Sequence, residues 1–505
     1  MKKILSDQNQ WENKHETFTE TVKEFYTLGN ETSLNALQGY NDTTAGFQQM
    51  LQDAINTGTP LRSLGAGWSW TKIATAANGI MMDTKPLNTT FDITSKSVAP
   101  TYTGDVNKLL FAQCGNGIWE LSKELRDKNQ SLQTSGASNG QTIAGAIGTG
   151  AHGSSIDVGA VQDFVVGLHI ITSPSRHIYL ERKSAPVVSQ YFVDKIQAEL
   201  VQDDDLFYAA LISVGSFGII HGVMIEATDL FLLECYMQQM PYDDTLKKMM
   251  ATLDFSTAQL PCGNERPFHF AVSINPYDTN NLAYVTIMYK RPFTTNYTPP
   301  PRNTAGIGPG DDAACFVGTV TDVIPALVPT IVNKLLAGAL TPYSKVYGTL
   351  GEIFDNTTLH GKLMSAAIGI PLDQVERLTE LLFDLNKTEN AGPFCGLFSY
   401  RFVKKTNATL GFTHFDYTCI LELDGVFGNE TTNFYNAVWE KLDEENIPCT
   451  YHWGKMNNYN FNLINKMYGA NTDAWIAARN KLLDSNGLKI FTNPILQQWG
   501  LDKVL

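Results

Sequence analysis

The sequence lacks a long uninterrupted apolar run. Its most apolar stretch, Val323–Val332, is too short to cross a bilayer and contains two prolines. At the start of the chain only Ile4 and Leu5 precede polar residues, whereas a secretory signal carries an apolar stretch of about 7–15 residues. We therefore expect neither a membrane span nor a secretory signal.

Paired cysteine and metal-ligand spacings are also missing. The seven cysteines form no CxxC pair, and their odd number is typical of reduced thiols in a cytoplasmic protein. The nine histidines are scattered, without an H-x-x-x-H or a Cys/His ligand spacing. We expect a cytoplasmic protein without a metal site.

Basic residues are in deficit. The chain has 37 Lys and Arg against 51 Asp and Glu, a formal net charge of −14. A nucleic-acid or anionic-membrane surface would show a basic footprint, so we expect neither partner. The 43% hydrophobic and 17% charged residues are globular values. Because single cores stop growing near roughly 250–300 residues, 505 residues predict about two domains.

Hydrophobic periodicity gives a coarse outline of the elements. Residues 1–60 resemble a helical lead-in, because apolar residues recur at helical spacing from Leu34 to Ile55 before the stop signal Thr57–Pro60. A second helix is predicted at Ile118–Lys128. The remaining predictions are strands at Leu61–Leu64, Ile80–Met82, Phe164–Ile171, Phe268–Lys290 and Arg401–Gly428, a Pro/Gly loop at Tyr297–Asp312 and helices at Val317–Phe354.

The first chemical motif is Leu61–Ile73, with the sequence LRSLGAGWSWTKI. An apolar run enters a Gly65-Ala66-Gly67 turn, and successive N–H groups in such a turn form a nest for a phosphate. An ordinary tight turn remains the alternative reading. A G-x-G-x-x-G dinucleotide fingerprint is not supported, because position 70 is Trp.

The second motif is Thr134–Ser155, with six glycines in twenty-two residues (TSGASNGQTIAGAIGTGAHGSS). Such a run cannot be helical throughout, but its backbone donors can surround a polyanionic ligand. A disordered Gly/Ser linker is the alternative, although Ile143 and Ile147 supply apolar anchors. His152 is either a structural hydrogen-bonding residue or a ligand contact.

Further stretches carry a family resemblance. They are AANGIMMDTKPLN, DDDLFYAALISVGSFGIIHGVMIEATDLFLL, YHWGK at Tyr451–Lys455, and LKIFTNPILQQWGLD near the end. Together with LRSLGAGWSWTKIA and QTIAGAIGTGAHGSS, they resemble flavoproteins of the vanillyl-alcohol oxidase/para-cresol methylhydroxylase superfamily. Within it the chain is similar to the alditol oxidase and aldonolactone oxidoreductase branch, most strongly over 61–230 and 450–505.

The resemblance implies an α+β fold. It implies a two-part FAD-binding domain (PCMH-type) formed by residues 1–230 and 465–505, with a mixed α/β substrate domain, residues 231–464, lying over it. It also implies an FAD-dependent alcohol oxidase or dehydrogenase that oxidises a CH–OH group by hydride transfer to flavin N5. The expected partners are a small-molecule alcohol, such as a polyol or sugar lactone, and oxygen or another electron acceptor. A larger sterol-like alcohol, or a flavin-binding protein without turnover, are the alternatives.

The resemblance also implies the residues that hold FAD. Many relatives attach the flavin through a histidine in G-x-G-H-S, and here that position is Trp68, so we expect dissociable FAD. The expected cofactor-binding residues are Arg62, Ser63, Leu64, Gly65, Ala66, Gly67, Trp68, Ser69, Ser135, Gly136, Ser138, Gly140, Thr142, Ile143, Gly145, Ala146, Gly148, Thr149, His152, Gly153, Ile219, Ile220 and Lys455.

Three residues are the expected catalytic groups. Lys455 of the H-W-G-K match is expected near the flavin, where its charge would stabilise negative charge that develops during reduction. Arg401 retains the arginine of the branch's Glu-x-Arg motif, but Ser399 replaces its acid. Glu422, on a strand-like segment, is expected either as a base on the alcohol or as the ion-pair partner of Arg401.

Overall fold

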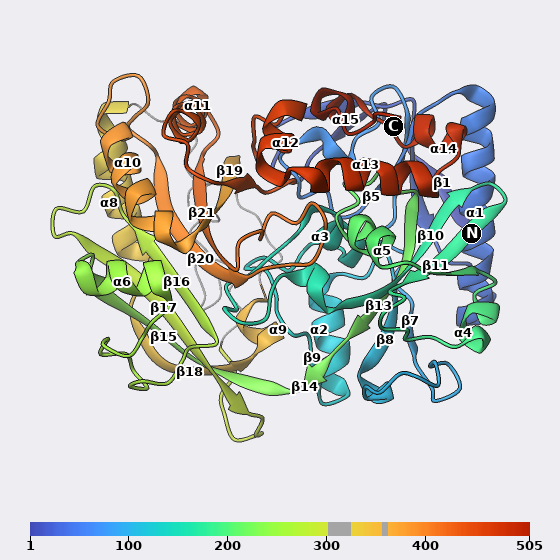
Figure 1. Cartoon of the computed structure of the whole chain (residues 1–505), viewed down its shortest axis with the longest axis horizontal. Helices are drawn as coiled ribbons and strands as arrows, with labels where there is room; N and C mark the ends of the chain where they lie inside the picture. Colours follow the sequence, from blue (N-terminus) through green and yellow to red (C-terminus); the bar gives the residue numbers. More distant parts are fainter. Residues whose placement is uncertain (301–324, 356–361, 505) are drawn as a thin grey trace.

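The computed structural model describes residues 1–300, 325–355 and 362–504. Helices and sheets are mixed throughout, in agreement with the α+β prediction. Figure 1 shows an eight-stranded sheet in one half of the molecule and the smaller sheets of the N-terminal segment in the other. Residues 301–312 of the predicted Pro/Gly loop and residues 317–324 of the predicted helical stretch lie outside the described residues.

Two sheets organise the first half. A four-stranded sheet has the order β1-β4-β6-β5 and a six-stranded sheet has the order β12-β11-β10-β13-β8-β7. Strand β10 is a nearly continuous apolar run and is buried along almost its whole length, as expected for a central strand. The strands are β1 (Lys2–Leu5), β4 (Glu24–Gly29), β5 (Leu61–Leu64), β6 (Ile80–Asp83), β7 (Thr90–Asp92), β8 (Leu109–Gln113), β10 (Val165–Ser173), β11 (Arg176–Glu181), β12 (Glu199–Gln202) and β13 (Ile219–Glu226).

The prediction of helical structure over residues 1–60 is correct only for the second part of this segment. Helix α1 (Ala36–Thr57) begins after an Asn35 cap and ends at Gly58 in the left-handed conformation. Residues 2–29 instead contain β1, β4 and the hairpin of β2 (Gln10–Glu12) and β3 (Thr19–Thr21). Strands β1 and β4 form because they pair within a sheet, in which β4 lies between β1 and β6. Segments of three to six residues are too short to show a period.

The second half is built on one sheet with the order β18-β15-β17-β16-β20-β21-β19-β22. Figure 1 shows α6, α8, α10 and α11 along its outer side. The strands are β15 (Phe231–Pro241), β16 (His269–Ile274), β17 (Leu282–Pro292), β18 (Tyr343–Thr349), β19 (Leu363–Pro371), β20 (Gly396–Lys404), β21 (Tyr417–Val426) and β22 (Thr450–Tyr451). The helices are α6 (Asp244–Thr252), α8 (Val328–Ala339), α10 (Val375–Leu385) and α11 (Asn429–Glu444).

The prediction of helices throughout Val317–Phe354 is wrong at β18. This segment pairs with β15 as an edge strand, with Glu234 opposite Tyr347, so sheet pairing determines its conformation. Helix α9 (Leu350–Ile353) follows it directly. Other short α-helices and strands of the described residues are α2 (Ile118–Asp127), β9 (Gln130–Ser131), α3 (Ile143–Thr149), α4 (Gln190–Lys195), α5 (Asp204–Leu211) and β14 (Thr228–Asp229).

The last helices return to the first half of the chain (Figure 1). They are α12 (Phe461–Tyr468), α13 (Ala470–Leu482), α14 (Ser485–Ile490) and α15 (Pro494–Trp499). In α13, Trp475 Nε1 donates to Ile212 O at 2.9 Å and Arg479 Nε donates to Ser216 O at 3.2 Å. The division into domains 1–230 with 465–505 and 231–464 stays a prediction.

Within the described residues, no helix combines the length and the apolar character that crossing a bilayer would require.

Candidate active site

A long pocket is lined by segments that are far apart in the sequence. The turn after β5, the Gly-rich run around α3, the loop before β13, strands β20 and β21, and the segment after β22 all reach it. The predicted site residues that line it are Arg62, Ser63, Leu64, Gly65, Ala66, Gly67, Trp68, Ser69, Gly136, Ser138, Thr142, Gly145, Ala146, Gly148, Thr149, His152, Ile220, Arg401, Glu422 and Lys455. Ser135, Gly140, Ile143, Gly153 and Ile219 are not among the lining residues.

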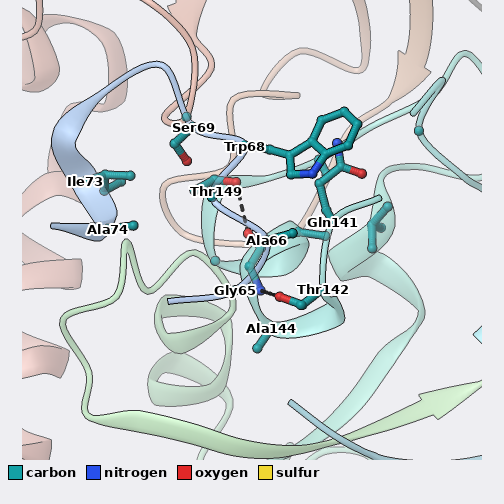
Figure 2. Close-up of a pocket in the computed structure, with 18 of the residues that line it drawn as sticks. Gly65, Ala66, Trp68, Ser69, Ile73, Ala74, Gln141, Thr142, Ala144 and Thr149 are labelled. Atoms are coloured by element: carbon teal, nitrogen blue, oxygen red, sulfur yellow. Dashed lines mark hydrogen bonds between the residues drawn. The ribbon is translucent and has the colours of Figure 1, made fainter. Parts of the chain in front are cut away.

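The two glycine motifs meet at one side of this pocket. Figure 2 shows the turn from Gly65 to Ser69 beside α3, with Thr142 at the start of this helix and Thr149 at its end. A methyl group on Gly65 would overlap the hydroxyl of Thr142, so the close approach requires glycine. Thr142 Oγ1 in turn accepts from Gly145 N at 3.3 Å and caps α3. The motifs therefore form one backbone-lined wall.

One wall of the pocket contains Arg62, a buried arginine whose hydrogen-bonding groups are only partly used. Arg62 Nη1 donates to the carbonyls of Val214 and Gly215, while Nε and Nη2 have no hydrogen-bond partner among the described residues. Burial, together with the nearby charge of Arg479, lowers the pKa of Arg62 to about 9, so this side chain remains charged at neutral pH. Buried charges are normally paired, so Arg62 fits an anionic ligand such as a pyrophosphate.

A cluster of charged side chains lies at another part of the pocket. Lys455 Nζ is 2.6 Å from Glu422 Oε1, and Arg401 Nε is 2.6 Å from Glu422 Oε2. His152 Nε2 lies 3.7 Å from Glu422 Oε1. Glu422 and Arg401 are 3% and 6% exposed, so these ion pairs are shielded from water and little screened by salt. The predicted contact between Arg401 and Glu422 is therefore present, and Lys455 joins it.

The sheet register explains how Glu422 reaches this cluster. Strands β20 and β21 are antiparallel, and Ser399 pairs directly with Glu422. Directly opposite side chains lie on the same face, and Arg401 shares that face because it is two residues beyond Ser399. A carboxylate is thus supplied from the neighbouring strand at the position where Ser399 lacks one.

The two cations determine the protonation state of Glu422. Burial alone would raise the pKa of this carboxyl, but Arg401 and Lys455 outweigh it and hold the pKa well below its ordinary value. Glu422 is therefore ionised at neutral pH and is a weak proton acceptor. This geometry favours the ion-pair interpretation of Glu422 over the alternative interpretation as a base.

Two histidines adjoin the cluster as neutral rings. Burial lowers the pKa of His152 to about 4 and the pKa of His452 well below its ordinary value. His152 Nδ1 lies 3.0 Å from the carbonyl oxygen of Gly153, so Nδ1 carries the proton. His452 Nδ1 accepts from Gly454 N at 3.0 Å, so its proton is on Nε2. The lone pair of His152 Nε2 is consequently on the side of Glu422.

Several pocket residues were missed by the sequence analysis. Three of them, Gln141, Trp70 and His452, lie inside motifs that had been recognised. The motifs themselves therefore indicated that these residues could line the site. Asp424 follows Glu422 by two residues on β21 and shares its face. His15 gave no signal, because it reaches the pocket through the β2–β3 hairpin, which the sequence did not predict. Among the described residues, no group of three or more His, Cys, Asp or Glu side chains is arranged to hold a metal.

Comparisons with known proteins find an FAD-binding domain in this chain. Residues 40–178 match a family described as an FAD binding domain. The chain is 21% identical to L-gulono-1,4-lactone dehydrogenase of Mycobacterium tuberculosis, over 87% of this chain and 90% of that protein. It is 28% identical to D-arabinono-1,4-lactone oxidase of Candida glabrata, over 27% of this chain and 22% of that protein. The chain contains an FAD-binding domain and is an FAD-dependent oxidoreductase similar to aldonolactone oxidases and dehydrogenases.

A solved structure shares the fold of this flavoprotein. Cholesterol oxidase from Brevibacterium sterolicum matches with a TM-score of 0.70 and 14% identity, covering 98% of this chain and 97% of that chain. The expected two-part FAD-binding fold is thereby confirmed. The backbone-lined wall and the unpaired nitrogens of Arg62 fit FAD, which carries two phosphates.

Proposed function

We propose that this flavoprotein oxidises a hydroxyl-bearing carbon of a sugar lactone or a related polyol. The observation that carries the proposal is the buried cluster of Lys455, Glu422 and Arg401 in the pocket wall. Charged groups held in fixed positions suit a substrate with several hydroxyl and carbonyl oxygens. The names of the lactone dehydrogenase and lactone oxidase relatives support the same substrate class.

The residues of the cluster have distinct roles in this proposal. FAD, when bound, supplies the acceptor for the hydride that leaves the substrate carbon. Glu422 holds Lys455 and Arg401 in place, and the positive charge of these two side chains orients substrate oxygens and stabilises negative charge in the transition state. His152 Nε2 has an acceptor lone pair beside them for a hydroxyl proton. Arg62 and the backbone of the Gly65–Ser69 turn bind the phosphates.

The sterol-like alternative has less support. It rests on the changed Glu-x-Arg motif and on the apolar stretch Val317–Leu340, whose described part starts at residue 325. Val328, Val332 and Leu340 pack with Met237 and Leu397 in a separate apolar cluster, and none of these three lines the pocket. The likeness to a cholesterol oxidase extends to the fold, at 14% identity.

Anaerobic reduction of the FAD-loaded protein tests the proposed function. Sugar lactones, linear polyols and a detergent-solubilised sterol are added separately. The absorbance of the oxidised flavin is followed at about 450 nm. We expect a lactone or a polyol to bleach the band. Bleaching by the sterol alone would overturn the proposed substrate class, and bleaching by no alcohol would favour a flavin-binding protein without turnover. Oxygen uptake with the active substrate then shows whether oxygen is the electron acceptor.

A further inference from the structure

The N-terminal hairpin, residues 10–21, lies over the turn that follows β5. Lys14 N donates to Gly67 O at 2.9 Å, and Asn13 Nδ2 donates to Ser69 O at 3.1 Å. A Cβ on Gly67 would lie 2.9 Å from Trp11 Cζ2, so the hairpin packs tightly on this turn. The hairpin precedes the segment 40–178 that matches the FAD binding domain family.

His15 lies in the loop of this hairpin and reaches the pocket. Its side chain is fully buried and lines the pocket. The imidazole stacks on Trp70 with a centroid separation of 3.7 Å and an interplanar angle of 23°. His15 Nε2 lies 3.0 Å from Trp68 O. Trp68 and Trp70 of the cofactor turn therefore fix the orientation of this ring.

The contacts of His15 also fix its tautomer. A carbonyl oxygen only accepts, so Nε2 carries the proton and donates to Trp68 O. Burial lowers the pKa of His15 to about 3, which keeps the ring neutral at physiological pH. Nδ1 is then a bare acceptor, and it has no hydrogen-bond partner among the described residues. A buried acceptor without a donor is costly, which points to a donor that a ligand supplies.

The position of His15 indicates which part of FAD supplies that donor. Lys455 Nζ lies 5.9 Å from the centroid of the Trp70 ring on which His15 stacks, so His15 belongs to the same end of the pocket as the charged cluster. The reacting flavin ring has to lie at this end for the proposed function. The flavin carries a ring N–H group and its ribityl chain carries hydroxyls, and both are hydrogen-bond donors.

We propose that His15 Nδ1 accepts a hydrogen bond from the flavin half of FAD, so that the N-terminal hairpin helps to retain a cofactor that Trp68 cannot bind through a histidyl link. The inference rests on the proposed function only for the orientation of FAD in the pocket. It assigns a cofactor contact to a residue outside the glycine motifs.

Binding of FAD and of ADP to the apoprotein tests the inference. FAD affinity is measured by the change in flavin fluorescence, and ADP affinity by calorimetry. His15→Phe keeps an aromatic ring on Trp70 but removes both nitrogens, and we expect it to weaken FAD binding about tenfold while ADP affinity changes less than about twofold. His15→Asn places an amide oxygen near the position of Nδ1 and should retain more affinity for FAD than His15→Gln, whose amide lies near Nε2.

A matched control is available in His414→Phe. His414 is a partly buried histidine outside the pocket, beside Phe415 and Tyr468, and its substitution should leave both affinities unchanged. Unchanged FAD affinity in His15→Phe would overturn the inference, and so would an equal loss of FAD and ADP affinity, which would mark a purely structural role. Neither readout involves turnover, so failure of the proposed oxidation leaves this result separately interpretable.

Discussion

Trp68 determines how the cofactor is expected to be held. It occupies the position at which many relatives carry the histidine that bonds to the flavin, and its ring packs against Gly140, where a methyl group would overlap it. Because tryptophan cannot form the histidyl link, acid precipitation of the FAD-loaded protein should leave the yellow colour in the supernatant. The check is flavin fluorescence in a denaturing gel, where a band retained on the protein would contradict the expectation.

Under the proposed function, Lys455 is the residue whose charge most directly concerns the chemistry. It lies 2.6 Å from Glu422 at the pocket wall, and it is aligned by that ion pair. Lys455→Met removes the charge and keeps most of the side-chain volume. We expect flavin reduction to slow about 10²–10³-fold, the usual cost of removing one positioned donor, while the FAD content stays near normal. Rapid-mixing reduction kinetics provide the measurement, and an unchanged rate would place Lys455 outside the reacting site.

At the scale of elements, the pairing of β20 with β21 supplies the carboxylate that Ser399 lacks. Because Glu422 is the common partner of Arg401 and Lys455, Glu422→Gln removes the carboxylate that both cations share. We expect much slower flavin reduction, unchanged FAD stoichiometry and a loss of about 3–5 kcal/mol in the free energy of unfolding, as when one partner of a buried ion pair is removed.

A matched control for that substitution is Glu199→Gln. Glu199 pairs with Arg176 at the surface, where an ion pair contributes about 0–1 kcal/mol. Stopped-flow reduction and urea unfolding are measured on both variants. If Glu422→Gln behaved like Glu199→Gln in both experiments, the ion-pair cluster would have no functional role.

Periodicity predicted some of the longer elements and few of the short ones. Helices α1 and α2 and strands β5, β16 and β21 fall within predicted segments, and β6, β10 and β17 extend one or two residues beyond them, because long runs and Gly or Asn stop signals identify them locally. Strand β20 overlaps its predicted segment only at its last four residues, and the long elements β15, α11 and α13 were not predicted. Strand β18 and the strands of residues 2–29 depend on pairing with distant segments, which a local pattern does not show. Consequently the glycine motifs were found from sequence, while His15 in the N-terminal hairpin was not.

At the scale of the whole molecule, buried neutral histidines link stability to pH. Six described histidines are buried: His15, His152, His169, His221, His269 and His452. Burial lowers the pKa of each, to about 4 for His152 and to about 3 for His15, His221 and His269. In the unfolded chain a histidine has a pKa of about 6.5. Just below that pH the unfolded chain therefore binds protons, while these histidines stay neutral in the folded protein.

This linkage gives a prediction with a definite sign. As pH falls from about 6.5 toward 4, the unfolded state binds more protons than the folded state, so the free energy of unfolding decreases. The expected slope is about 1.4 kcal/mol per pH unit for each such histidine. Urea midpoints at pH 7.5, 6.5 and 5.5, at constant FAD and salt, measure it. A midpoint that stays constant between pH 6.5 and 5.5 would contradict the prediction.

The return of the last helices to the first half has a consequence for biosynthesis. Asn493, at the start of α15, donates to the carbonyls of Lys72 and Thr75 at 3.2 and 2.9 Å, and Arg479 reaches the loop before β13. On the ribosome, these carbonyls and this loop emerge some four hundred and some two hundred and sixty residues before their partners. The nascent chain must therefore hold a partly formed first half until residues 479 and 493 have been translated, which makes that interval the period of greatest exposure to chaperones and proteases.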